Sequence, residues 1–195
     1  MNEFFTILAF LSLQASNLAV ANENESSLIH YLTPSHDSFV RKDRKDKSHG
    51  QGGKITITKA GSRQRIGLMK FDTSDYDTVK EGSKVSLRLG VADIHESKSV
   101  HIKVYAMKDD FHEDHIDWNT FNGFTTRASM IDFHVNADQK DKIGEIDVSE
   151  LMYDGQDIVF AFIVEGEGHV KFHSKEHTAS VMMRPRLVID RRTEL

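Results

Sequence analysis

The stretch Val85-Ser86-Leu87-Arg88-Leu89-Gly90-Val91 decides the fold class, because its aliphatic residues recur at every second position. Successive side chains of a β-strand point to opposite faces, so this period places the four aliphatic side chains on one face. Ser86 and Arg88 then lie on the other face. The stretch therefore predicts an antiparallel β-strand with one face in a core.

The same alternation recurs along the chain. In Val100-His101-Ile102-Lys103-Val104-Tyr105-Ala106 the aliphatic residues share one face, and His101, Lys103 and Tyr105 share the other. Shorter candidate strands are 36–42, 54–58, 65–71, 130–135, 143–148, 157–164, 170–173 and 185–190. About ten strands in one domain are expected to form two packed layers. The sequence thus predicts an all-β fold, a jelly-roll-like two-sheet antiparallel β-sandwich.

One candidate strand, Ile158-Val159-Phe160-Ala161-Phe162-Ile163-Val164, is apolar on both faces. A strand in the middle of a sheet buries both faces when one lies in the core and the other lies under a loop. A buried helix is the alternative. Seven residues rich in β-branched and aromatic types favour the strand.

The first 21 residues have the features of a secretory signal peptide. An apolar run over residues 4–13 precedes Ala19-Val20-Ala21, a small-x-small pattern that signal peptidase accepts. Glu3, with no Lys or Arg before the run, leaves an uncleaved anchor or a buried segment as alternatives. The run is shorter than the about 20 residues that span a bilayer, so no membrane span is expected.

The rest of the chain has the size of one domain. We expect a signal peptide at 1–21, an N-terminal extension at 22–35, the sandwich at 36–191 and a tail at 192–195. This organisation predicts a secreted, extracellular protein. The last four residues, Arg-Thr-Glu-Leu, loosely resemble an ER-retrieval signal, so the ER lumen is the alternative. The sequon at Asn24 would be glycosylated only in a host with that machinery.

The composition argues against nucleic acid as a partner and leaves the fold without disulfide bonds. The chain has 25 basic and 30 acidic residues, a net charge of -5, which argues against nucleic acid as the main partner. It contains no cysteine. An exported fold without disulfides depends on core size, hydrogen-bonded sheets or a bound ion.

Four segments carry a resemblance to a known family: 68–74, 104–119, 146–151, and 172–176 leading to 185–189. Together they resemble the DNRLRE domain, the group that includes carbohydrate-binding module family 96. The second segment is the most specific, since Phe111-His112-Glu113 and Asp117-Trp118-Asn119 stand where the family has Trp-Thr-Glu and Thr-Trp-Asn. The resemblance covers about residues 37–190.

The resemblance implies a secreted β-sandwich that binds a polysaccharide without cleaving it, and an acidic, alginate-like polymer is the family's typical ligand. Three departures bear on that ligand. Phe111 replaces the first family Trp, Lys175 replaces the usual Arg, and residues 48–53 replace an Asn-Tyr-Gly turn.

Two basic regions are candidate ligand-binding surfaces. The first is a charged run at 41–47, which contains Arg41, Lys42, Arg44 and Lys45. Arginine in such a run can hold a carboxylate or sulfate through two hydrogen bonds. The alternative is a solvated loop without a specific ligand.

The second candidate surface is a sheet face. His169, Lys171 and His173 alternate along one strand, Lys175 continues their parity, and Lys103 and Tyr105 form a comparable face on another strand. These residues predict a cationic, partly aromatic surface for an acidic chain, strengthened as the histidines protonate below about pH 6.5. The alternative is an ordinary solvated outer face.

Trp118, the single tryptophan, is either a stacking platform for a sugar ring or the buried anchor of a long loop. The pair His112 and His115 does not have the spacing of a zinc motif.

A structural calcium ion is the only cofactor that we consider, and its candidate ligands are Asp37, Asp109, Asp110 and Asp147. Turn and cap carboxylates are the alternative for each of them.

The sequence has no cysteine nucleophile and no Gly-x-Ser-x-Gly motif. The Gly-rich segment 50–53 precedes a strand and not a helix, so it does not predict a phosphate loop. We therefore expect a binding module and not an enzyme. The alternatives are an adhesive matrix protein and a polysaccharide lyase that acts through Lys, His and Tyr.

Overall fold

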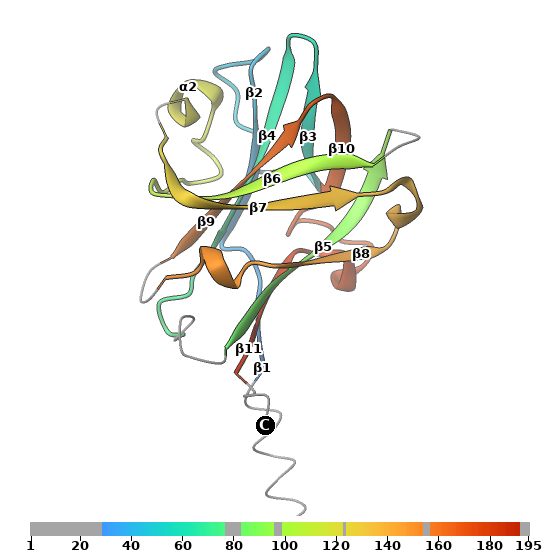
Figure 1. The fold of residues 1–195 in the computed structure, drawn as a ribbon. Helices are drawn as coiled ribbons and strands as arrows, with labels where there is room; N and C mark the ends of the chain where they lie inside the picture. Colours follow the sequence, from blue (N-terminus) through green and yellow to red (C-terminus); the bar gives the residue numbers. More distant parts are fainter. Residues whose placement is uncertain (1–28, 77–82, 96–98, 123, 154–156, 192–195) are drawn as a thin grey trace, which may run out of the picture.

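The computed structural model describes residues 29–76, 83–95, 99–122, 124–153 and 157–191. The predicted signal peptide, the Asn24 sequon and the predicted tail lie outside these ranges. Within them, the chain forms eleven antiparallel strands and little helix (Figure 1). None of the helices in the described ranges has the length and hydropathy that crossing a bilayer requires.

The strands alternate with short turns and few helical segments. The strands are β1 (Ile29–Leu32), β2 (His36–Arg41), β3 (Lys54–Ala60), β4 (Arg63–Phe71), β5 (Lys84–Ile94), β6 (Val100–Met107), β7 (Thr126–Val135), β8 (Ile143–Asp147), β9 (Ile158–Glu165), β10 (Gly168–His173) and β11 (Arg186–Asp190). The helical segments are α2 (Trp118–Phe121) and the 3-10 turns η1 (Ala137–Gln139), η2 (Ser149–Leu151) and η3 (Val181–Met183).

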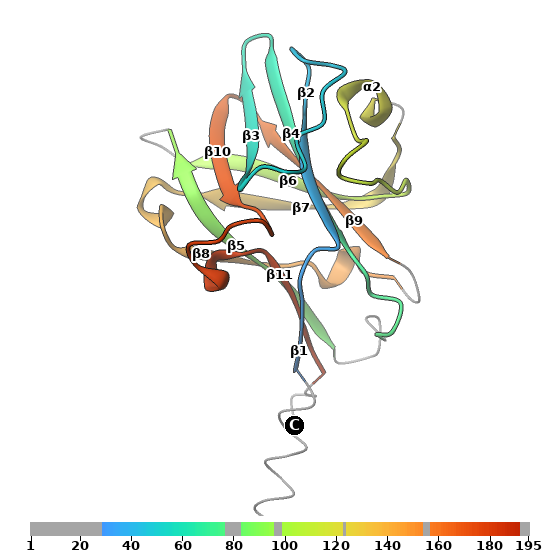
Figure 2. The same cartoon turned by 180° about the vertical axis from the view of Figure 1, so that it is seen from behind.

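The strands form one curled sheet whose order is β1-β11-β5-β10-β3-β4-β9-β6-β7, with β2 paired to β4 and β8 paired to β5. Strand β5 connects the two layers. Its first part pairs with β8 and β11, and its last part pairs with β10. Figure 1 shows β6 and β7 crossing one side of the molecule, and Figure 2 shows β2, β3 and β10 on the opposite side.

The predicted all-β sandwich is confirmed, and each of the ten predicted segments coincides with a strand. The structure adds β1, which pairs with β11 over four residues. This strand lies within the segment 22–35 that we predicted as an extension, so ordered structure begins before residue 36.

Strand β9 has the mid-sheet position that its composition predicts. It pairs with β4 on one side and with β6 on the other. One face carries Phe160 and Phe162 into the main core, which fills the inside of the curl. The other face carries Val159 and Ala161 into a second core. The strand interpretation of this segment is therefore confirmed, and the helix alternative is wrong.

The second core lies under the long connection between β6 and β7. Phe111, Ile116 and Phe121 from this connection pack on the outer face of β9. Trp118 is half-buried and packs against the same cluster, with its ring centroid 6.4 Å from that of Phe121. This position agrees with the interpretation of Trp118 as a loop anchor.

Candidate functional site

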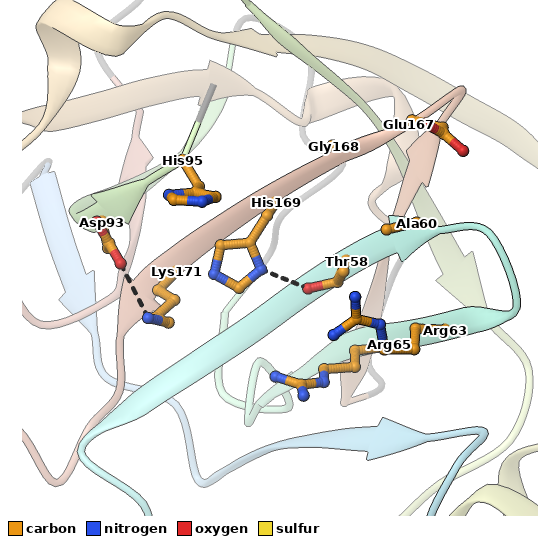
Figure 3. Close-up of a pocket in the computed structure, with 10 residues that line it drawn as sticks. All are labelled: Thr58, Ala60, Arg63, Arg65, Asp93, His95, Glu167, Gly168, His169 and Lys171. Carbon is orange, nitrogen blue, oxygen red and sulfur yellow. Dashed lines mark hydrogen bonds and ion pairs between the residues drawn. The ribbon is translucent and has the colours of Figure 1, made fainter. Parts of the chain in front are cut away.

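A shallow groove with a volume of about 540 Å³ crosses four neighbouring strands, β5, β10, β3 and β4 (Figure 3). Its size lies within the usual range for ligand sites, about 300–1,000 Å³. Five of its side chains can carry a positive charge: Arg63, Arg65, His95, His169 and Lys171. Asp93 and Glu167 are its acidic members.

Strand alternation explains why these side chains project together. In β3, Ile55 and Ile57 enter the core, so Thr58 faces the groove; in β10, Val170 enters the core between His169 and Lys171. Pairing of neighbouring strands then brings these groove-facing side chains side by side.

The register places the groove residues in rows. Thr58 lies opposite Arg65 on β4 and opposite His169 on β10, and Lys171 lies opposite Asp93 on β5. Adjacent strands are about 4.8 Å apart, so the four strands span about 14 Å. The groove thus offers a line of polar groups to an extended ligand.

Two hairpin turns lie at one end of the groove. Gly61 has φ +55° in the two-residue turn between β3 and β4, a conformation that favours glycine. Its backbone N–H donates to Glu167 Oε1 at 3.3 Å in the β9–β10 turn. This contact holds the two turns together. It also positions the start of β4, where Arg63 and Arg65 project from the same face.

The two arginines have unused hydrogen-bonding capacity. Among the described residues, no hydrogen bond or ion pair holds the guanidinium of Arg63 or Arg65, and Arg65 Nε is buried without a partner. Burial, together with the nearby Arg41, lowers the pKa of Arg65, but a guanidinium stays charged at neutral pH. Two planar cations therefore line the groove, and no described residue occupies their guanidinium donors.

Lysine 171 is only partly available, because Asp93 already pairs with it. Lys171 Nζ lies 2.9 Å from Asp93 Oδ2, and this hydrogen bond lowers the pKa of Asp93. Lys140 Nζ lies 3.9 Å from the other Asp93 oxygen. Asp93 thus orients Lys171 across the groove floor.

His169 is positioned by Thr58, whose Oγ1 lies 2.6 Å from His169 Nδ1. Burial lowers the pKa of His169 from 6.5, and the charges of Lys171 and Arg65 lower it further. We expected the histidines to charge below about pH 6.5; for His169 the structure moves that change to lower pH.

A family model for carbohydrate-binding module family 96 matches residues 29–191, a range that includes all eleven strands. The chain belongs to this family. The match confirms the resemblance inferred from the motifs and begins at the first residue of β1. A comparison of this chain with curated proteins found no match.

The family 96 module separates the residues that we predicted on the β10 face. His169 and Lys171 line the groove. His173 is buried and packs against His177, with ring centroids 3.8 Å apart and ring planes tilted by 38°, and burial lowers the pKa of His173. Lys175 lies beyond the strand and pairs with Glu113 and Glu176. The expected row of four accessible side chains is therefore reduced to two.

The second predicted face, on β6, lies apart from the residues that line the groove. Lys103 Nζ pairs with Glu165 Oε1 at 2.8 Å, and His101 pairs with Asp132 and Glu165. Tyr105 packs against the second core. These cations already have acidic partners.

The basic run at 41–47 forms an exposed loop of the module. Arg41 Nη2 lies 2.6 Å from Asp43 Oδ2, and this hydrogen bond lowers the pKa of Asp43 to about 2. Lys42, Arg44 and Lys45 are exposed. The loop is a second cationic surface, outside the groove.

Three of the four calcium candidates have ordinary cap or ion-pair roles. Asp109 accepts from Thr125, Asp110 pairs with Lys70, and Asp147 accepts from Ser149. Asp37 is different, because it is buried beside Glu113 and Glu176. Burial raises the pKa of Asp37 to about 8, and the Glu176 and Glu113 charges add to the rise.

Sequence reasoning missed Arg63 and Arg65, the two groove arginines that have no partner among the described residues. The predicted strand began at residue 65, whereas β4 begins at Arg63. The turn glycine Gly61 followed by two arginines at alternate positions was a usable signal. The sequence did not predict that they lie near His169. β3 pairs with both β4 and β10, which are about a hundred residues apart in the chain.

Proposed function

We propose that this family 96 module binds an acidic polysaccharide, such as a polyuronate, in the groove across β5, β10, β3 and β4. The observation that carries the proposal is the pair of guanidiniums of Arg63 and Arg65, which have no partner in the described part of the chain and line a hollow of about 540 Å³. Membership in a carbohydrate-binding family supports a glycan ligand. The charge of the groove favours one that carries carboxylates.

The chemistry of recognition follows from the groove residues. Each guanidinium can hold a uronate carboxylate through two parallel hydrogen bonds. Lys171 and the two histidines supply further donors to carboxylates and hydroxyls along the same line. The groove is open to solvent, so salt should screen these charges and weaken binding.

We further propose that the module binds its polymer without cleaving it. A lyase of the kind considered above needs a base and an acid converging on one sugar. Tyrosine is not among the described residues that line the groove, and Lys171 is paired with Asp93. An absorbance assay for unsaturated product tests this, and a steady rise proportional to module concentration would contradict it.

The binding test compares two matched double variants. The first is Arg63→Ala with Arg65→Ala in the groove, and the second is Lys42→Ala with Arg44→Ala in the basic loop. Affinity electrophoresis with alginate, pectin and a neutral glucan, at two ionic strengths, measures binding. We expect retardation of the wild type by the acidic polymers only, more strongly at low salt.

The groove variant should bind at least about tenfold more weakly, because hydrogen bonds to charged groups contribute about 1.5 kcal/mol or more each. The loop variant should retain most of the affinity. Retardation by no acidic polymer, or loss of binding in the loop variant alone, would overturn the groove assignment.

We also propose that the module is exported, with the segment 1–21 removed as a signal peptide. The support is the apolar run and the Ala19-Val20-Ala21 pattern. Expression of the full chain in a secreting host, followed by N-terminal sequencing of the exported protein, should give a first residue at 22. Retention of the whole chain inside the cell would contradict this proposal.

A further inference from the structure

Outside the groove, three carboxylates from distant parts of the chain meet at one buried point. Asp37 is the second residue of β2, Glu113 lies in the connection after β6, and Glu176 follows β10. Each offers an oxygen atom, and these atoms all lie within 4.8 Å of one another. Two oxygens on opposite sides of a calcium ion are separated by about this distance, since Ca–O bonds are about 2.4 Å long.

Two of the three side chains are buried, Glu176 is half-buried, and the hydrogen bonding of the cluster is incomplete. Asp37 is 1% exposed and Glu113 is 7% exposed. Asp37 Oδ2 accepts from the backbone N–H of Lys175 at 2.7 Å, but Oδ1 is buried without a hydrogen-bond partner. Glu176 Oε2 is in the same condition. Buried oxygens without donors are costly, so these two indicate a missing electropositive partner.

The charges of the cluster do not balance. Lys175 is the one lysine or arginine that contacts the carboxylates in the described chain, with Nζ 2.9 Å from Glu113 Oε1 and 2.8 Å from Glu176 Oε1. His36 Nδ1 lies 3.8 Å from Glu113 Oε2, but burial lowers the pKa of His36. No ion pair joins Asp37 to that ammonium among the described residues, and with all three carboxyls ionised one ammonium leaves two negative charges. Burying uncompensated charge is strongly unfavourable. One divalent cation would restore neutrality.

We propose that Asp37, Glu113 and Glu176 bind a single Ca²⁺ ion. The three side-chain ligands are all carboxylate oxygens, which suit a hard cation, and calcium tolerates the irregular geometry of a site built from three separate segments. The ion ties β2, the connection after β6 and the segment after β10. This site is independent of the groove, so its test does not use glycan binding.

The ion also acts on the Gly-rich segment beside the cluster. Ser48 Oγ donates to the carbonyl oxygen of Glu113, and a β-carbon at Gly50 would lie only 2.6 Å from that oxygen. Glu113 is therefore held from its backbone by this segment and from its carboxylate by the ion. Calcium should therefore stabilise the connection that carries Glu113 and the Gly-rich segment that packs against it.

The first test removes one ligand. Module stripped with a chelator is titrated with CaCl₂ by calorimetry and is unfolded thermally with and without the ion. Wild type should bind one ion and unfold at a higher temperature in calcium. Asp37→Asn should bind at least about tenfold more weakly, because the number of charged ligands sets the affinity of oxygen sites. Asp138→Asn, at an exposed position outside the cluster, should behave as wild type.

A second variant keeps the test decisive if Asp37→Asn folds poorly. Lys175→Met removes the competing ammonium, so this variant should be unstable in chelator and should be rescued by calcium. The proposal is overturned if calcium neither binds nor shifts the unfolding temperature of wild type, if Asp37→Asn binds calcium as wild type does, or if only Zn²⁺ or Mg²⁺ produces the shift.

Discussion

At the scale of single residues, the groove differs from the other basic surfaces in how its cations are paired. Lys103 and Arg41 each have a carboxylate within 2.8 Å, so an incoming anion would have to displace that partner. Arg63 and Arg65 have no such competitor among the described residues. Exposed ion pairs contribute little to stability, but they do occupy donors that a ligand needs. Pairing, more than charge alone, distinguishes the groove.

His169 makes the binding of an acidic polymer sensitive to pH. Burial first, then Lys171, Arg65 and His95, lower its pKa, whereas Asp93 raises it. At neutral pH the ring is uncharged. A polyuronate would favour the charged ring, so affinity should rise as the pH falls below the usual histidine range. Titration of alginate binding between about pH 7.5 and about pH 5 measures this.

The same shift predicts the opposite trend for the stability of the free module. The folded pKa of His169 is below its unfolded value of 6.5, so protonation favours the unfolded chain. The stability from the neutral ring is fully present above pH 6.5 and decreases as the pH falls toward the folded pKa. His169→Gln should flatten both trends, whereas His134→Gln, on β7, should leave both unchanged. Identical pH profiles for wild type and His169→Gln would refute the role of this ring.

At the scale of elements, alternation predicted ten of the strands because each carries its pattern within a few residues. β5 and β6 are the clearest cases. β1 was missed because it has only four residues, which is too short a run to show an alternating pattern. The candidate site was harder to predict. The groove residues come from strands whose pairing is non-local. In the separate carboxylate cluster, Glu113 was recognised from the sequence only as a motif residue without a role.

The connection between β6 and β7 is an element whose packing can be tested through Phe111, which replaces a family Trp. Phe111 is 6% exposed in the second core. Phe111→Ala should reduce the free energy of unfolding by about 3 kcal/mol, from lost burial and the cavity left behind. Val181→Ala, at a position that is 54% exposed, should change it by less than about 0.5 kcal/mol. Urea denaturation compares them, and equal losses would show that the second core contributes little.

At the scale of the whole molecule, β5 makes the two layers one cooperative unit. Its residues up to Gly90 pair with β8 and β11, and its residues from Val91 onward pair with β10. Unfolding either layer would therefore expose one edge of a strand that the other layer needs. β9 couples the two cores, because one of its faces packs in the main core and the opposite face packs in the second core. The molecule should unfold in one step.

Trp118 provides the measurement of that cooperativity. It is the only tryptophan of the chain and packs on the second core, so its fluorescence reports the connection between β6 and β7. Far-ultraviolet circular dichroism reports the strands. Both signals should give the same urea midpoint, as expected for a two-state domain. A fluorescence midpoint at lower urea would show that the connection opens before the sandwich, and that the anchoring of Glu113 does not hold it to the sheet.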